Sequence, residues 1–249
     1  MKVILRYAKR LMICLSASIM AVFVIAACVF GVKGYRMYKA AVKEKPVSEI
    51  AVSARNQKNF VKYEELPQIY IDAVISAEDK RFEKHCGIDI KAIGRVVWID
   101  IATMSFAEGG STITQQIAKN QLFSQEKRLE RKFAEVFAAF ELEKEYSKKE
   151  LFEIYVNTIY FGSGYYGIYD AAYGFFGKEP AQLTDYEAVM LAALPNAPSV
   201  YSPGKNIELV EKRMSVVLRR MIKCGRITEQ KAGLILNKQV LRGGEYANG

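Results

Sequence analysis

One long apolar run at the start of the chain is followed by a series of amphipathic stretches. Residues Leu11–Val32 carry no charged side chain, and an apolar helix of that length can cross the hydrocarbon core of a bilayer. From Leu66 onward, apolar residues recur three and four positions apart, and no segment shows the sustained alternation typical of a half-buried strand. The pattern predicts an all-α domain preceded by one N-terminal transmembrane helix.

The charges that flank the apolar run predict its orientation. Lys2, Arg6, Lys9 and Arg10 precede it, which favours a cytoplasmic N-terminus and an exported domain, although basic residues that follow the run weaken this asymmetry. We expect four regions: a cytoplasmic tail over 1–10, a transmembrane anchor over 11–32, a charged juxtamembrane connector over 33–62 and a folded domain over 63–240.

Two other interpretations of the N-terminal run stay open. One is a cleaved signal peptide, whose apolar region is usually shorter than this run. The other is a lipoprotein, because Ile25–Cys28 resembles a lipoprotein processing site in which Cys28 would be lipidated. Apolar residues continue for four positions beyond Cys28, so we expect a retained, single-pass anchor.

The composition fits one sizeable domain in addition to the anchor, since the chain has 249 residues and a net charge of +9. Two of the four cysteines lie in the anchor, and Cys86 and Cys224 alone do not make a disulfide framework. One histidine and two distant cysteines also lack the spacing of a zinc site. The basic surplus suits a solvated surface as well as contact with anionic lipid or phosphate.

Local signals predict where several helices begin and end. A Ser or Thr followed three positions later by Glu or Gln has the spacing of a capping box, and this spacing occurs at Thr112, Ser147 and Thr184. We expect helices over Lys127–Tyr146 and over Ile207–Cys224, the second of which is closed by a glycine.

A carboxylate lies on the apolar face of the helix that follows Leu66. Glu78 comes four residues after Val74 and four before Phe82, and we expect all three on one helical row. Burying an unpaired carboxylate is unfavourable, and apolar surroundings make a carboxylate a better base near neutral pH. Glu78 is therefore either a candidate general base or a structural acid paired with Arg81 or another cation, and this stretch alone favours neither.

A second candidate site begins at a Gly-Ser-Thr sequence. Thr112, Gln115, Gln116 and Lys119 share one face of the helix expected there. A helix start with glycines and hydroxyls suits anionic groups. A solvated face is the alternative, but the density of amide and hydroxyl side chains favours a polar ligand such as a sugar.

The next helix carries a pair of cations close to an acid. Arg131 and Lys132 lie one turn before Glu135. An ordinary intrahelical ion pair explains that spacing, and on this spacing alone it is the favoured interpretation.

The apolar segment Val96–Phe106 contains Trp98, the only tryptophan. It suits either a buried core helix or a flap that dips into the membrane interface, where Trp is favoured. We expect this segment to be mobile in the absence of substrate, whereas a rigid, buried Trp98 would favour the core interpretation.

Taken together, the motifs resemble the peptidoglycan glycosyltransferases of family 51, which occur alone or fused to penicillin-binding transpeptidase domains. Five segments match in the family's order, between about Tyr63 and Met221, and five matches in register are far more specific than any single one. They are Glu78–Gly87, Gly110–Asn120, Arg131–Glu141, Glu153–Gly162 and Arg213–Met221. Two residues depart from the usual pattern, namely Val156 in place of leucine and Lys127 in place of an arginine common near that point.

The resemblance implies a lysozyme-like, two-lobed helical fold on the extracytoplasmic side of the bacterial plasma membrane. The implied reaction polymerises lipid II into glycan strands by inverting transfer. The growing chain, linked to a lipid diphosphate, is the donor, and the 4-hydroxyl of the GlcNAc of lipid II is the acceptor. Because the chain ends soon after the fifth motif, we expect the monofunctional type.

The resemblance also implies roles for individual residues. Glu78 is expected to be the base and Glu135 a second, supporting acid. Cations are expected to matter more than a general acid, because the leaving diphosphate is already anionic. The residues implied to contact substrate are Asp79, Phe82, His85, Ser111, Thr112, Gln115, Gln116, Lys119, Asn120, Lys127, Arg131, Lys132, Glu153, Tyr155 and Asn157.

Several points beyond the catalytic residues follow as expectations. No residue pattern requires a cofactor, although a divalent cation such as Mg²⁺ or Mn²⁺ could bridge the substrate diphosphate. Partners are expected to be lipid II, the growing glycan chain, the plasma membrane and other cell-wall synthesis proteins, with no nucleic acid. The alternatives are a lysozyme-like hydrolase or lytic transglycosylase that cuts glycan, and an anchored scaffold without activity.

Overall fold

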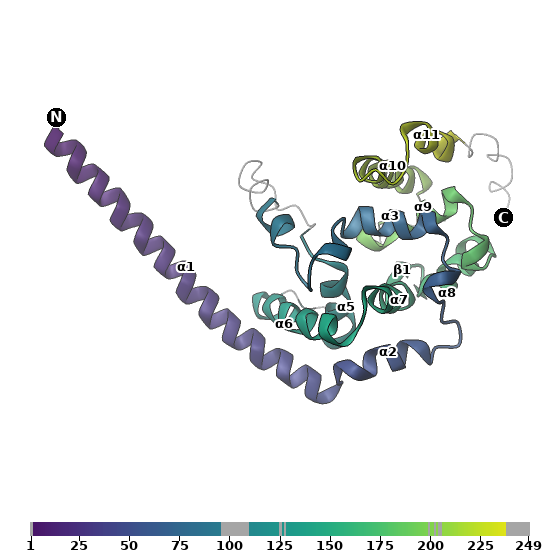
Figure 1. Cartoon of the computed structure of the whole chain (residues 1–249), viewed down its shortest axis with the longest axis horizontal. Coiled ribbons are helices and arrows are strands. Elements are labelled where there is room, and N and C mark those ends of the chain that lie inside the picture. Colours follow the sequence, from purple (N-terminus) through teal and green to yellow (C-terminus); the bar gives the residue numbers. More distant parts are fainter. Residues whose placement is uncertain are drawn as a thin grey trace.

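The computed structural model describes residues 2–95, 110–124, 126, 128–198, 200–201, 203 and 206–237. The segment Val96–Phe106 and Lys127 therefore lie outside the described residues, and the expectations for them stay predictions. The described part is helical almost throughout (Figure 1), which confirms the all-α prediction. Its only strands are the short hairpin β1 (Tyr160–Gly162) and β2 (Tyr165–Tyr166).

The described helices include α-helices and short 3-10 turns. In chain order they are α1 (Lys2–Glu44), α2 (Val47–Arg55), η1 (Tyr63–Glu65), α3 (Gln68–Glu78), η2 (Phe82–Lys84), α5 (Ile113–Leu122), α6 (Leu129–Glu145), α7 (Lys148–Thr158), α8 (Ile168–Phe176), η3 (Pro180–Gln182), α9 (Asp185–Ala193), η4 (Leu194–Asn196), α10 (Ile207–Lys223) and α11 (Glu229–Asn237).

The three predicted capping boxes are confirmed. The hydroxyls of Thr112, Ser147 and Thr184 accept hydrogen bonds from the backbone N–H three residues later, at 3.1, 3.3 and 3.4 Å. They begin α5, α7 and α9 by satisfying N–H groups that have no partner within the helix. The predicted helix over Ile207–Cys224 is also confirmed as α10, after which Gly225 adopts φ +69°.

One predicted helical row is wrong. Phe82 does not continue the helix of Val74 and Glu78, because α3 ends at Glu78 and Phe82 lies in the separate 3-10 turn η2. Asp79, at φ −153° and ψ 74°, breaks the helix. The break leaves Glu78 as the last residue of α3, with 11% of its side chain exposed, and leaves Phe82 fully buried in the core.

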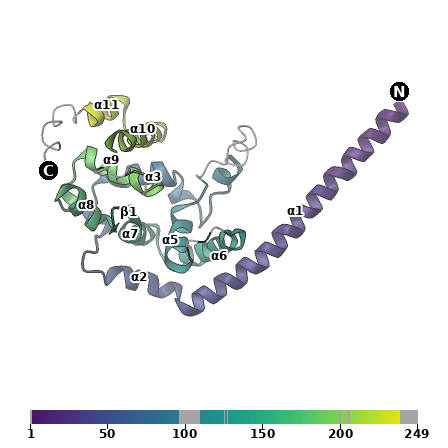
Figure 2. The same ribbon diagram turned by 180° about the vertical axis from the view of Figure 1, so that it is seen from behind.

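Most of the region expected to be a connector is helical and packs on the domain. α1 continues unbroken to Glu44 and lies beside α6, and α2 packs on α6 and α7. The Tyr146 hydroxyl, at the end of α6, donates to the Val47 carbonyl at 2.7 Å and accepts from the Ala51 N–H at 3.3 Å. Within the described residues, one helix, Lys9–Glu44, is long and apolar enough to cross a membrane. The N-terminal part of α1 projects away from the domain (Figure 2).

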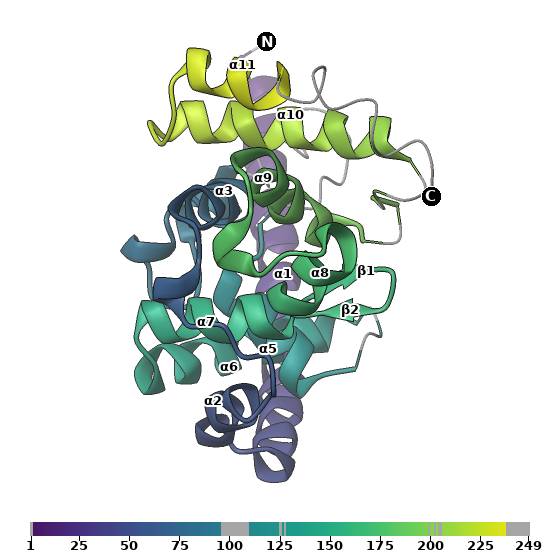
Figure 3. The same ribbon diagram turned by 90° about the vertical axis from the view of Figure 1, so that its right-hand side faces the viewer.

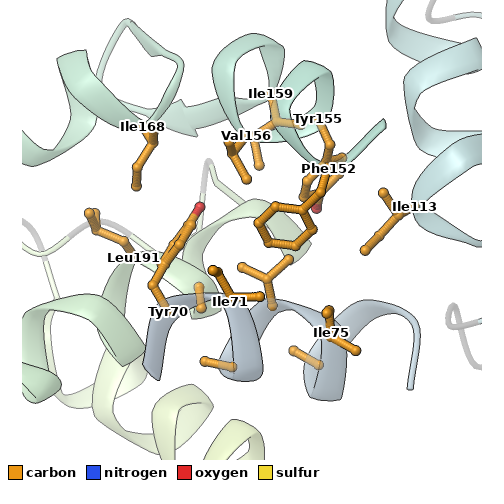
Figure 4. Packing of buried hydrophobic residues seen from close by; sticks show 14 of the residues in the cluster. Tyr70, Ile71, Ile75, Ile113, Phe152, Tyr155, Val156, Ile159, Ile168 and Leu191 are labelled. Carbon is orange, nitrogen blue, oxygen red and sulfur yellow. The ribbon is translucent and has the colours of Figure 1, made fainter. Parts of the chain in front are cut away.

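The helices of the domain form two groups around a shared core. Figure 3 shows α10 and α11 across the top, α3 and α9 beneath them, and α5, α6 and α7 below. α3 packs on α9 and α10, while α5 packs on α6 and α7. Figure 4 shows the junction, where Tyr70, Ile71 and Ile75 of α3 face Phe152 and Tyr155 of α7. Burial of these side chains stabilises the packing of α3 against α7.

Asn157 joins the segment after α2 to the core. It is 2% exposed, its side-chain oxygen accepts from the Val61 N–H at 2.9 Å, and its side-chain nitrogen donates to the carbonyls of Val61 and Glu153 at 2.8 and 2.9 Å. All three contacts are internal to the fold. They give Asn157 a structural role that does not require substrate.

Replacing Asn157 should therefore destabilise the fold. Asn157→Ala leaves the Val61 N–H and carbonyl buried without their partner, so we expect the free energy of unfolding to fall by about 2 kcal/mol or more. Denaturant unfolding followed by circular dichroism measures this change. Asn59→Ala is the matched control, because the Asn59 side chain makes an exposed hydrogen bond to Asp170. Equal stability of the two variants would contradict the structural role.

Candidate active site

Glu78 lies at the C-terminal end of α3, facing α5 and α10. Its side chain is 11% exposed. One carboxylate oxygen accepts a hydrogen bond from the side-chain amide of Gln116 at 2.7 Å, and the other lies 4.0 Å from the Arg213 guanidinium. The carboxylate is thus held in place by an amide, has a cation nearby and keeps part of its surface open to a ligand.

The start of α5 is held beside the end of α3 by a group of buried side chains. The Asp79 carboxylate accepts from the Ile113 N–H at 3.1 Å and contacts the His85 Nε2 at 2.8 Å. The Thr112 hydroxyl donates to the Gly87 carbonyl at 2.6 Å. These contacts align α5 so that Gln116, one turn further along, reaches Glu78.

A second carboxylate, Glu135, is buried in α6 with two cations. It is 1% exposed, with the Arg131 Nε at 3.2 Å and the Lys132 Nζ at 2.7 Å. The Lys132 ammonium also donates to the Ser111 hydroxyl at 2.7 Å, across to the segment before α5. The negative charge of Glu135 offsets the repulsion between the two cations. Glu135 can therefore hold Arg131 and Lys132 close to each other.

Lys119 of α5 lies within electrostatic range of both carboxylates. Its side chain is half-buried, and desolvation lowers the pKa of its ammonium. The nearby charges of Glu135 and Glu78 oppose that effect, while Arg131 and Lys132 add to it. Lys119 is therefore a partly desolvated cation within electrostatic range of Glu78 and of the cation pair on α6. An anionic ligand bound there would reduce the repulsion among these cations.

Two further polar groups are buried close to Glu78. Burial, together with the charge of Glu78, raises the pKa of the Tyr155 phenol, and burial lowers the pKa of the Arg213 guanidinium. The Tyr155 hydroxyl and the Arg213 Nε have no hydrogen-bond partner within the described residues. Sequence reasoning did not name Arg213 as a site residue, although it begins the fifth motif, which was the available signal.

The residues expected to contact substrate divide into two groups. Those near the two carboxylates are Ser111, Gln116, Lys119, Arg131 and Lys132, with the Tyr155 hydroxyl buried beside them. The other described residues of this set, apart from Asn120, make contacts within the fold: Asp79, Phe82, His85, Thr112, Gln115, Glu153 and Asn157. Asn120 lies half-buried in α5. A role in substrate contact stays a prediction for both groups.

No group of three or more His, Cys, Asp or Glu side chains in the described part of the chain is arranged to hold a metal ion. Glu78 and Glu135 are engaged by nitrogen donors of Gln116, Arg131 and Lys132. The geometry is suited to binding an anion beside a carboxylate.

Comparisons with known proteins identify relatives of this chain. Penicillin-binding protein 1A/1B of Bacillus subtilis is 41% identical over 195 residues, covering 78% of this chain and 21% of the relative. Penicillin-binding protein 1F of the same organism is 43% identical over 184 residues, covering 74% of this chain and 26% of the relative. The chain thus spans about a fifth to a quarter of the length of these relatives.

A crystal structure of Penicillin-Binding Protein 1A from Haemophilus influenzae also matches, with a TM-score of 0.42, 24% identity, and coverage of 71% of this chain and 17% of that one. The family model described as Transglycosylase matches residues 43–222, which include every described residue of the candidate site. Since that match covers most of the chain, the protein belongs to the transglycosylase family.

Proposed function

We propose that the protein polymerises lipid II into peptidoglycan glycan strands. The observation that carries the proposal is the pairing of a partly exposed carboxylate, Glu78, with a separate group of cations on α5 and α6. Lys119 lies in electrostatic range of Glu78 and of Glu135, and Arg131 and Lys132 flank Glu135. A base beside a cluster of cations is what glycosyl transfer from a diphosphate requires.

In the proposed step, Glu78 accepts the proton of the 4-hydroxyl of the GlcNAc of lipid II. The hydroxyl oxygen forms a bond to the anomeric carbon of the growing chain as the bond from that carbon to the diphosphate oxygen breaks. The electron pair leaves with the lipid diphosphate. A single displacement of this kind converts an α-linked donor into a β-linked product.

The cations act on the leaving group. Lys119, Arg131 and Lys132 stabilise the negative charge that develops on the diphosphate as the bond breaks, so no general acid is needed. Glu135 keeps Arg131 and Lys132 oriented, with ion-pair distances of 3.2 and 2.7 Å. The partial desolvation of Lys119 strengthens its attraction for an anion.

The substrates of this reaction are lipids held in a membrane. The long apolar helix α1 could keep the protein at the same membrane. We propose that α1 anchors the protein in the bacterial plasma membrane as a single pass, with the catalytic domain on the extracytoplasmic side. The basic N-terminal residues support this orientation. Lipid II and the growing glycan chain are then confined to the same surface as the active site.

Incubation of the purified full-length protein with labelled lipid II tests the proposal. We expect a glycan polymer to form, with release of one lipid diphosphate for each bond. A parallel incubation with preformed glycan strands distinguishes the glycan-cleaving alternative. Fragments from the strands, without polymer from lipid II, would contradict the proposed function.

A further inference from the structure

The transmembrane helix is in direct backbone contact with the helix that carries the site cations. Gly34 of α1 is buried against α6, and a Cβ atom placed on it would lie 2.5 Å from the Cβ of Phe133, 2.8 Å from the carbonyl oxygen of Glu130 and 3.0 Å from the N of Ala134. Such distances leave no room for any side chain. The two helices approach this closely only because residue 34 is a glycine.

Residues on either side of Gly34 also contact α6, and together these contacts form a seam between α1 and α6. The Tyr38 hydroxyl donates a hydrogen bond to the Glu141 carboxylate, and the Tyr35 ring packs edge-on against Phe137 with a centroid distance of 5.3 Å. One residue before Gly34, Lys33 lies 3.7 Å from Glu130. α1 and α6 therefore run side by side in the same direction over about two turns (Figure 1), which leaves little freedom between them.

α6 presents the candidate site beside this seam. Glu130 and Phe133 meet α1, while Arg131 and Lys132, which lie between them in sequence, reach Glu135 and Ser111. A displacement of α6 along α1 would thus move the cations by a similar distance. The position of the cations relative to the membrane is fixed by where α1 docks.

The docking point lies close to the expected edge of the bilayer core. The charge-free residues 11–32 number 22, and as a helix they span about 33 Å, close to the roughly 30 Å of the hydrocarbon core. Gly34 follows two residues, or about 3 Å, beyond the end of that run. Its contact with α6 therefore falls at the level of the lipid headgroups.

We infer that Gly34 is a positioning residue, which holds the cations of α6 at the height where the diphosphate of a membrane-embedded lipid lies. This inference rests on the proposed function, because the position of a lipid diphosphate affects turnover only if such a lipid is the substrate. Gly34 contacts no substrate. Its effect passes through α6 to Arg131 and Lys132.

The test compares Gly34→Leu with Gly31→Leu, in the full-length protein. Gly31 lies one turn earlier in α1, and a Cβ placed there would meet nothing within 4 Å, so it is a matched control. Turnover is measured with lipid II in phospholipid vesicles and with a short-chain, water-soluble analogue. A misplacement of about 1 Å between reacting groups can lower rates about 100-fold. We expect Gly34→Leu to reduce turnover in vesicles about tenfold or more, because the cations would be displaced relative to a diphosphate whose height the membrane fixes.

With the soluble analogue, Gly34→Leu should retain turnover within about threefold of the wild type, because the height of the site no longer matters. Gly31→Leu should match the wild type with both substrates. If Gly34→Leu fails to fold, Gly34→Ala and Gly31→Ala replace the leucine pair, since the clash at residue 34 begins at Cβ.

Three results would overturn the inference. One is equal turnover of the two variants in vesicles, and another is an equal loss with both substrates, which would indicate local damage to α6. The third is a wild-type protein that is inactive with both substrates, which would also contradict the proposed function and is recognised by the wild-type measurement alone.

Discussion

Glu78→Gln should lower lipid II polymerisation about 100- to 10,000-fold, the range that one positioned general base supplies. Glutamine has nearly the same size as glutamate, and its amide oxygen can still accept the hydrogen bond from Gln116. It cannot take a proton from the acceptor hydroxyl. The loss should therefore fall on the chemical step, while the affinity for lipid II stays close to that of the wild type.

Steady-state and single-turnover rates with fluorescent lipid II separate these effects. Glu83→Gln is the matched control, because Glu83 is an exposed glutamate on the neighbouring turn η2. Thermal unfolding checks that both variants are folded. A Glu78→Gln enzyme that polymerises at a rate within threefold of the Glu83→Gln enzyme would remove Glu78 from the role of base.

Lys119→Ala should produce the second large loss, on the side of the leaving group. We expect turnover to fall about 100-fold or more, in line with the removal of one preorganised charge stabiliser from a transition state. The fold should be preserved, because alanine is a good helix former in α5 and, among the described residues, the Lys119 ammonium has no hydrogen bond or ion pair. Lys223→Ala, at an exposed lysine in the last turn of α10, is the control.

The pH dependence gives this prediction a second readout. Desolvation lowers the pKa of Lys119 below that of an ordinary lysine, so its charge is present at low pH and is lost as the pH rises through the lowered value. We expect kcat/KM, which reports groups of the free enzyme, to fall on the alkaline side. Lys119→Arg should keep its charge and extend activity to higher pH. An unchanged alkaline limb in this variant would assign that limb to another group.

The starts of α5, α7 and α9 could be predicted from sequence because capping is local. The hydroxyl that accepts and the N–H that donates are three residues apart at Thr112, Ser147 and Thr184. The helical composition of the domain followed from the spacing of apolar residues in the same way.

The end of α3 could not be predicted because it depends on a distant partner. Asp79 leaves the helix to bind the Ile113 N–H, 34 residues along the chain. The packing of residues 33–62 was missed for a similar reason, since Gly34 and Val47 meet their partners about a hundred residues away. The charged residues on the exposed face of this segment made it resemble a solvated connector. Its apolar face becomes evident only when the tertiary structure shows what covers it.

The candidate site shows the same limit. Spacing placed Arg131, Lys132 and Glu135 on one helix, and the observed distances of 3.2 and 2.7 Å are those of an intrahelical group. Spacing could not show that Lys119 lies within electrostatic range of both Glu78 and Glu135, because three separate helices contribute these residues. Only the resemblance of five motifs to one family linked these residues before their geometry was known.

The most direct test of the account is chemical rescue of the missing base. Glu78→Ala removes the carboxylate and leaves space that a small carboxylate such as formate can enter, since the Glu78 side chain is in part accessible to solvent. We expect formate to restore part of the lipid II turnover of Glu78→Ala in proportion to its concentration, and to leave Lys119→Ala unimproved. Wild-type turnover by Glu78→Ala without formate, or equal stimulation of both variants, would contradict the assignment of Glu78 as the base.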